Sequence, residues 1–213
     1  MIPSDHDLAR LCAASELNPI GFDYIDDGAE TGVWFGIVRR PDNDIVCFRG
    51  SITVDDWMRD FYAEMVSLPT VGLVHAGFAE NMQLVAAKIK TLIKPNPIIT
   101  GHSLGAARAA IYGGMLTADV HEDPVHIVLF GCPRPGGQQL VNCLQNINVA
   151  SYKNRHDPVT DVPLPLPDLD YTQVRDFTHI DGMVDTSLPP PFDDHHIVNY
   201  VKGIENAKSS TAA

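Results

Sequence analysis

Hydrophobic and polar positions along the chain follow two periods, one typical of helices and the other of strands. Residues 78–93 carry hydrophobic side chains at steps of three and four positions, which predicts an amphipathic helix. Residues 4–16 show the same period, and Ser4 can cap the start of a helix there. Short hydrophobic runs bounded by turn residues predict buried strands. These runs lie at 33–40, 45–48, 97–100, 125–130 and 149–153.

Helical segments separate the later strands. An alanine-rich stretch at 106–117 and the segments 138–144 and 197–204 are expected to be helices. Strands that alternate with helices favour a mostly parallel sheet covered by helices on both faces. The proline-rich region 158–191 predicts loops with one strand pairing at 171–180. We therefore expect a single α/β domain over residues 1–213, with a disordered tail at 207–213.

An excess of acidic side chains limits the classes of partner that the protein is expected to bind. The chain has 15 Lys and Arg against 27 Asp and Glu, a formal net charge of −12. Such a surface repels polyanions, so nucleic acid is not expected as a partner. The sequence has no transmembrane segment and no signal-peptide pattern at its start, which favours a cytoplasmic location, with a secreted mature form as the alternative. Nothing in the sequence indicates the oligomeric state.

The strongest chemical signal is the pentapeptide Gly101-His102-Ser103-Leu104-Gly105, which follows a predicted strand and precedes a predicted helix. A serine on such a tight turn points its hydroxyl away from the sheet, as the nucleophile of a serine hydrolase does. The two glycines let helix and strand approach closely. The backbone N–H of Leu104, at the helix start, can stabilise an oxyanion. Ser103 is therefore the predicted nucleophile.

A serine nucleophile needs a base and an acid that orients the base. Asp157 follows the strand 149–153 and is the first candidate acid; its competitors are Asp161, Asp168 and Asp170. The candidate bases are His179, His195 and His196, and periodicity does not distinguish between the last two. The run Asp193-Asp194-His195-His196 contains metal-ligating residue types, but adjacent residues rarely point at one ion, so we expect no metal site and no cofactor.

Several further motifs follow one another along the chain. They are Phe48-Arg49-Gly50-Ser51, Asp55-Asp56-Trp57, Val74-His75-Ala76-Gly77-Phe78, the serine pentapeptide, Gly131-Cys132-Pro133-Arg134-Pro135-Gly136, and Asn154-Arg155-His156-Asp157-Pro158-Val159. In this order they resemble the motifs of the class 3 lipases, which have the α/β-hydrolase fold, and the resemblance extends from about residue 33 to residue 200. In addition, Asp194-His195 with Tyr200 is similar to the ending of the bacterial and plant-like members.

This resemblance implies roles for individual residues. Asp157 would be the triad acid, and the register of the last motif favours His195 over His196 as the base. Ser51 would supply the second oxyanion donor beside Leu104. A short lid-like segment would cover about residues 52–74, with Trp57, Phe61 and Tyr62 near the substrate. Core packing is the alternative interpretation of that apolar segment.

The expected function is hydrolysis of carboxylic esters, either short- to medium-chain acyl esters or acylglycerols, through an acyl-enzyme. The expected partner is an ester or lipid substrate, with transient contact to a lipid interface. Three alternatives use the same fold: a feruloyl-type esterase, an acyltransferase, and a catalytically silent binding module. A silent module is expected to lack a triad member or the oxyanion serine, and all four residues are present here.

Overall fold

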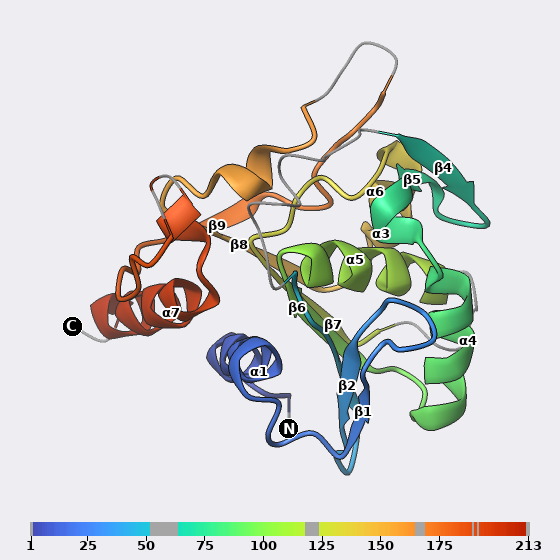
Figure 1. Ribbon diagram of the computed structural model, residues 1–213, viewed down its shortest axis with the longest axis horizontal. Coiled ribbons are helices and arrows are strands. Elements are labelled where there is room, and N and C mark those ends of the chain that lie inside the picture. Colours follow the sequence, from blue (N-terminus) through green and yellow to red (C-terminus); the bar gives the residue numbers. More distant parts are fainter. Residues whose placement is uncertain are drawn as a thin grey trace.

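A seven-stranded sheet forms the centre of the molecule (Figure 1). The computed structural model describes residues 2–51, 64–117, 124–164, 169–188, 190 and 192–211. The strand order is β1-β2-β3-β6-β7-β8-β9, in which β3 and the strands that follow it are parallel neighbours while β1 and β2 are antiparallel. The strands are β1 (Tyr24–Asp26), β2 (Phe35–Val38), β3 (Ile45–Phe48), β6 (Ile98–His102), β7 (His126–Phe130), β8 (Val149–Asn154) and β9 (Phe177–Ile180). The predicted mostly parallel sheet is confirmed.

Helices cover both faces of this sheet (Figure 1). On one face lie α4 (Met82–Leu92), α5 (Leu104–Leu116) and α6 (Gln138–Leu144); on the other lie α1 (Asp5–Leu17) and α7 (Ile197–Thr211). Side chains alternate between the two cores along each central strand, because successive strand residues point to opposite faces. In β7, for example, Ile127 packs toward α5 whereas Val128 packs toward α1 and α7.

Three local features differ from the sequence prediction. The expected helix at 78–93 is two helices, α3 (Ala76–Ala79) and α4, because Asn81 between them adopts a left-handed backbone with φ of 56°. Helix α7 continues to Thr211, so residues 207–211 of the expected tail are helical. Strand β1 was not predicted; its three residues are too few to show a period.

The described part of the expected lid-like segment is a β-hairpin. Strands β4 (Met65–Leu68) and β5 (Gly72–His75) pair with each other in a separate two-stranded sheet. The hairpin is tied to the rest of the molecule by the backbone N–H of His75, which donates to the carbonyl oxygen of Pro135 at 3.0 Å. The first part of the segment, with Trp57, Phe61 and Tyr62, lies outside the described residues.

Two short 3₁₀ helices complete the fold, η1 (Pro158–Asp161) and η2 (Phe192–His195). They follow β8 and precede α7, so they bring two polar segments to the end of the sheet where β6 meets α5 (Figure 1). Among the described residues, no helix is both long enough and apolar enough to cross a bilayer.

Candidate active site

Ser103 lies on the turn between β6 and α5. Its backbone has φ of 56° and ψ of −127°, a conformation that residues other than glycine rarely adopt. The turn is tight because a Cβ atom on Gly101 would collide with the backbone of Gly105, and one on Gly105 would collide with that of Phe48. The two glycines therefore let β6, β3 and α5 come together at Ser103, as the sequence motif predicts.

The turn is fixed to the neighbouring strand. The backbone N–H of Ser103 donates to the carbonyl oxygen of Phe130, at the end of β7, at 3.0 Å. The carbonyl oxygen of Ser103 accepts from Ala106 and Ala107 and so begins α5. Ser103 itself is 2% exposed. The serine thus sits at the carboxyl edge of the parallel strands, where open α/β sheets carry their functional loops.

Asp157 is fully buried in the loop after β8 and accepts three hydrogen bonds. Its Oδ1 accepts from the backbone N–H of Val159 at 2.9 Å, which caps η1. Its Oδ2 accepts from Nδ1 of His195 at 2.7 Å and from the hydroxyl of Tyr200 at 2.5 Å. Burial alone would raise the pKa of Asp157, but His195 and these donors outweigh burial, so the pKa lies below its usual range.

His195, the last residue of η2, is buried. Since the carboxylate of Asp157 can only accept, Nδ1 carries the proton of their hydrogen bond and Nε2 is left as the basic nitrogen. Among the described residues, Nε2 is buried without a hydrogen-bond partner. Burial lowers the pKa of His195 and Asp157 only partly offsets that effect, so the ring is held neutral at neutral pH.

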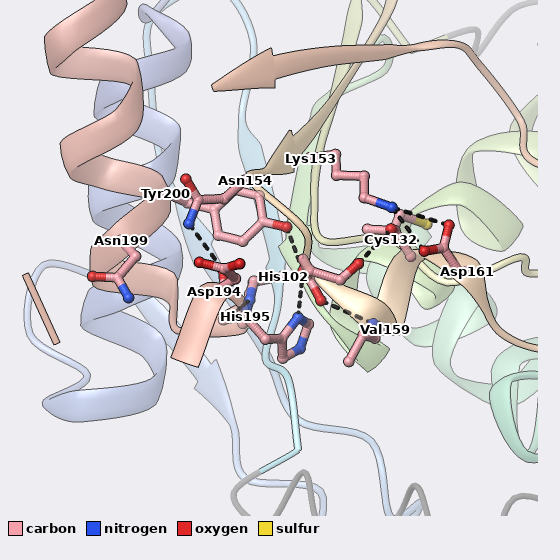
Figure 2. A network of polar contacts seen from close by, with 12 residues as sticks. His102, Cys132, Lys153, Asn154, Val159, Asp161, Asp194, His195, Asn199 and Tyr200 are labelled. Atoms are coloured by element: carbon pink, nitrogen blue, oxygen red, sulfur yellow. Dashed lines mark hydrogen bonds and ion pairs between the residues drawn. The ribbon is translucent and has the colours of Figure 1, made fainter. Parts of the chain in front are cut away.

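Polar contacts from β8 hold the segment that carries His195 (Figure 2). The Asn154 side-chain amide donates to the carbonyl oxygen of Asp194 at 3.0 Å. The Asp194 carboxylate accepts from the backbone N–H of His156 at 3.1 Å and forms an ion pair with Nε of Arg155 at 2.9 Å. From α7, the Asn199 amide donates to the carbonyl oxygen of Asp193 at 2.7 Å. The segment therefore has little freedom to move the imidazole away from Asp157.

Gly131 lies where Asp157, His195 and Tyr200 meet. Its φ is +57°, and a Cβ atom there would lie 3.0 Å from Oδ2 of Asp157, from Cε1 of His195 and from the hydroxyl of Tyr200. Only glycine tolerates both the backbone conformation and this crowding. The residue after β7 is thus part of the site although it has no side chain.

The competing candidates lie elsewhere. His196 contacts Ser187 at 2.9 Å through Nε2, and its Nδ1 lies 3.9 Å from Asp185. His179 is exposed on β9. Asp161 is 57% exposed and forms an ion pair with Lys153 at 2.8 Å (Figure 2). Asp170 is exposed, and Asp168 lies outside the described residues.

The two expected oxyanion donors flank the serine in the structure. Leu104 is the first residue of α5, so its N–H belongs to the group of N–H donors that have no acceptor within the helix. Ser51 follows Gly50, where a Cβ atom would lie 3.4 Å from the Cβ of Ser103. The described residues contain no cluster of three His, Cys, Asp or Glu suited to a metal ion.

Sequence reasoning missed some contributors. Glu16 on α1 reaches His102, from 86 positions away in the chain, and no local pattern indicates such a contact. The hydrogen bond of Tyr200 to Asp157 was also missed, although the tyrosine itself was part of a recognised motif. Asn154 belongs to a recognised motif as well, and its structural role shows only once β8 and η2 are seen side by side.

Comparison with known proteins agrees with this geometry. The family model described as lipase (class 3) matches residues 45–166 of the chain. The secreted mono- and diacylglycerol lipase 1 of Fusarium solani is 33% identical over 152 residues, which cover 64% of this chain and 44% of that protein. The chain therefore spans less than half the length of this relative.

Solved structures of lipases are similar in fold. The lipase from Rhizopus microsporus var. chinensis has a TM-score of 0.62 at 20% identity, over 75% of this chain and 67% of its own. A triacylglycerol lipase from Penicillium expansum also has a TM-score of 0.62, at 19% identity, over 84% of this chain and 79% of its own. These similarities confirm the predicted α/β-hydrolase fold.

Proposed function

Because the chain belongs to the class 3 lipase family, we propose that it hydrolyses carboxylic esters through an acyl-enzyme. Ser103 is the nucleophile, His195 the general base and Asp157 the acid that orients the base. The observation that carries this proposal is the buried pair of Asp157 and His195, 2.7 Å apart, in which the second imidazole nitrogen has no hydrogen-bond partner among the described residues. The ring of His195 lies 4.6 Å from that of His102, the residue before Ser103 on its strained turn.

The first half of the reaction forms the acyl-enzyme. The Oγ of Ser103 attacks the ester carbonyl carbon while Nε2 of His195 takes its proton. The new imidazolium is stabilised by Asp157, whose charge is kept by its three hydrogen bonds. When the tetrahedral intermediate collapses, the C–O bond to the alcohol breaks and His195 returns the proton to the leaving alcohol. Water then attacks the carbonyl carbon of the acyl-enzyme while His195 takes its proton. The bond to Oγ breaks, the proton passes to Ser103, and the carboxylic acid is released.

The developing negative charge on the carbonyl oxygen is stabilised by the N–H groups of Leu104 and Ser51. The positive end of the α5 dipole points at the same position, since Ser103 precedes the first residue of that helix. Removal of one such donor typically lowers turnover by about 100- to 1000-fold.

For the substrate we favour short- to medium-chain acyl esters or acylglycerols. The name of the fungal relative, a mono- and diacylglycerol lipase, supports the acylglycerol part of this proposal and also the secreted alternative for location. The proposal also includes transient contact with a lipid interface through the lid-like segment at about residues 52–74, with Trp57, Phe61 and Tyr62. A feruloyl-type esterase and an acyltransferase share the same chemistry and differ in the acyl group or in the acceptor.

A chain-length panel of p-nitrophenyl esters tests the proposal. Ser103→Ala and His195→Ala are each expected to lower kcat by about 10,000-fold or more. His196→Ala is the matched control, because it removes the same side chain one position away and is expected to change kcat less than about twofold. Activity that persists in Ser103→Ala would overturn the nucleophile, and a silent binding module would show no turnover even in the wild type. Product analysis with added alcohol separates acyl transfer from hydrolysis.

A further inference from the structure

A buried histidine that the proposed mechanism does not use lies directly behind the catalytic base (Figure 2). His102, next to the nucleophile, is 3% exposed. Its Nδ1 lies 2.8 Å from Oε1 of Glu16 on α1, and its Nε2 lies 2.8 Å from the backbone carbonyl oxygen of His195. The rings of His102 and His195 are 4.6 Å apart at an interplanar angle of 32°.

Both partners of this imidazole are acceptors. A carboxylate oxygen and a carbonyl oxygen have no proton to donate, and a neutral imidazole has one N–H. A neutral His102 would therefore place one nitrogen lone pair against an oxygen lone pair at 2.8 Å. An imidazolium has two N–H groups and satisfies both contacts.

The charge balance of the site fits an imidazolium. A buried cation is stable only when it is paired, and Glu16 supplies the opposite charge. A Cβ atom on Gly50 would lie 2.8 Å from Oε1 of Glu16, so the glycine leaves the space in which this carboxylate reaches the ring. Burial lowers the pKa of His102, but the charge and hydrogen bond of Glu16, together with the charge of Asp157 and the carbonyl oxygen of His195, outweigh burial, so the pKa lies above its usual value.

We infer that Glu16 is a positioning residue that keeps His102 as an imidazolium, and that this cation both holds the main chain of His195 and keeps the His195 ring neutral. The inference rests on the proposed role of His195 as the base. Glu16 belongs to α1, which lies outside residues 45–166, the segment that matches the family model. Helix α1 would therefore contribute to the site from a part of the chain outside the family match.

Charged and titratable groups from three elements act on the two rings. Glu16 comes from α1, Asp157 from the loop after β8, and Tyr200 from α7, with its ring 5.5 Å from that of His102. The His102 cation lowers the pKa of His195, whereas Asp157 and the more distant Glu16 raise it. Loss of the ion pair removes the effects of both His102 and Glu16 on the pKa of His195. The lowering by the nearer His102 cation is the larger of these two effects. The pKa of His195 therefore rises when the pair is lost.

Glu16→Gln separates charge from shape. A glutamine amide can donate to Nδ1 of a neutral His102, whose Nε2–H still reaches the carbonyl oxygen of His195, so the fold is kept while the ion pair is lost. The matched control is Glu30→Gln, because Glu30 is 86% exposed and its substitution changes the net charge by the same amount.

The first measurement is ¹⁵N NMR of histidine-labelled full-length protein at pH 7.5. We expect both ring nitrogens of His102 to be protonated in the wild type and in Glu30→Gln, and only one in Glu16→Gln. A neutral His102 in the wild type would overturn the inference. This readout needs no turnover, so it stands or fails separately from the proposed hydrolysis.

The second measurement is the pH profile of kcat/KM on p-nitrophenyl butyrate. In Glu16→Gln we expect the acid limb to move to higher pH, and kcat on the plateau to fall by about three- to tenfold with little change in KM, because the bond to His195 is no longer charge-assisted. A merely structural role for Glu16 would lower stability and leave the acid limb in place, and that result would also overturn the inference.

Discussion

The hydrogen bond from Tyr200 to Asp157 provides a direct test of how the acid is stabilised. Tyr200→Phe removes a buried hydroxyl that donates at 2.5 Å to Oδ2 and leaves the ring in place. Hydrogen bonds to charged groups contribute about 1.5–3 kcal/mol, so we expect the free energy of unfolding to fall by that amount at pH 7. His195 and the N–H of Val159 still donate to Asp157, which explains why the loss is not larger.

The loss should depend on pH in a defined direction. The pKa of Asp157 is lowered in the folded protein, so its stabilisation is present above the pKa of the unfolded chain, about 3.9, and is lost as pH falls through the lower folded value. The difference between wild type and Tyr200→Phe should therefore be constant above about pH 5 and narrow below about pH 4. Once Asp157 is protonated, the bond is a neutral one of about 1 kcal/mol.

Urea denaturation of both proteins at a series of pH values measures this difference. Tyr171→Phe is a matched control, since Tyr171 is also buried but its hydroxyl donates to a neutral backbone carbonyl, that of Glu64, at 3.1 Å. Its substitution should cost about 0.5–1.5 kcal/mol with no pH dependence. The reasoning is refuted if Tyr200→Phe is as stable as the wild type at pH 7, or if the difference does not narrow as pH falls through the lowered pKa of Asp157.

Three further predictions concern the same site. Gly131→Ala should lower kcat by about 100-fold and destabilise the fold by about 1–3 kcal/mol, because the added methyl group would lie 3.0 Å from atoms of Asp157 and His195. Ester turnover and urea denaturation measure the two effects, and turnover equal to that of the wild type would contradict the prediction. Ser103→Gly should abolish turnover yet raise the free energy of unfolding by about 1 kcal/mol, because glycine accepts a φ of 56° and a ψ of −127°; a loss of stability would argue against backbone strain. In a pH profile of kcat/KM, the acid limb should have its midpoint below the ordinary histidine pKa of 6.5. The reason is that burial lowers the pKa of His195 and that activity requires the neutral ring. A midpoint above pH 7 would contradict this prediction.

Much of the fold could be predicted from local patterns. The hydrophobic runs of β3, β6, β7 and β8 and the alanine-rich α5 have strong local signals, so their order and the parallel sheet followed from the sequence. Features that depend on a single backbone conformation or on partial burial could not be predicted. Asn81 interrupts an otherwise regular hydrophobic period, and β4 is only half-buried, so it shows neither alternation nor a continuous apolar run.

Site residues with a local sequence signal could likewise be predicted, whereas those that depend on tertiary packing could not. Ser103 could be found because strand, turn and helix are adjacent in sequence. The choice between His195 and His196 could not be made from periodicity, because η2 and the start of α7 direct adjacent side chains to different surroundings. The contact of Glu16 with His102 depends on how α1 packs against the sheet, and that information is not local.

The packing of α1 against α7 has a consequence for folding kinetics. These helices, Asp5–Leu17 and Ile197–Thr211, join opposite ends of the chain, and contacts of such long sequence separation form slowly because loop closure is entropically costly. The proposed nucleophile and acid, Ser103 and Asp157, belong to the middle of the chain, whereas the proposed base, His195, and its supports come from the two ends. A refolding intermediate with a complete sheet would therefore still be inactive. Recovery of esterase activity should lag behind recovery of secondary structure, and it would report the docking of the chain ends.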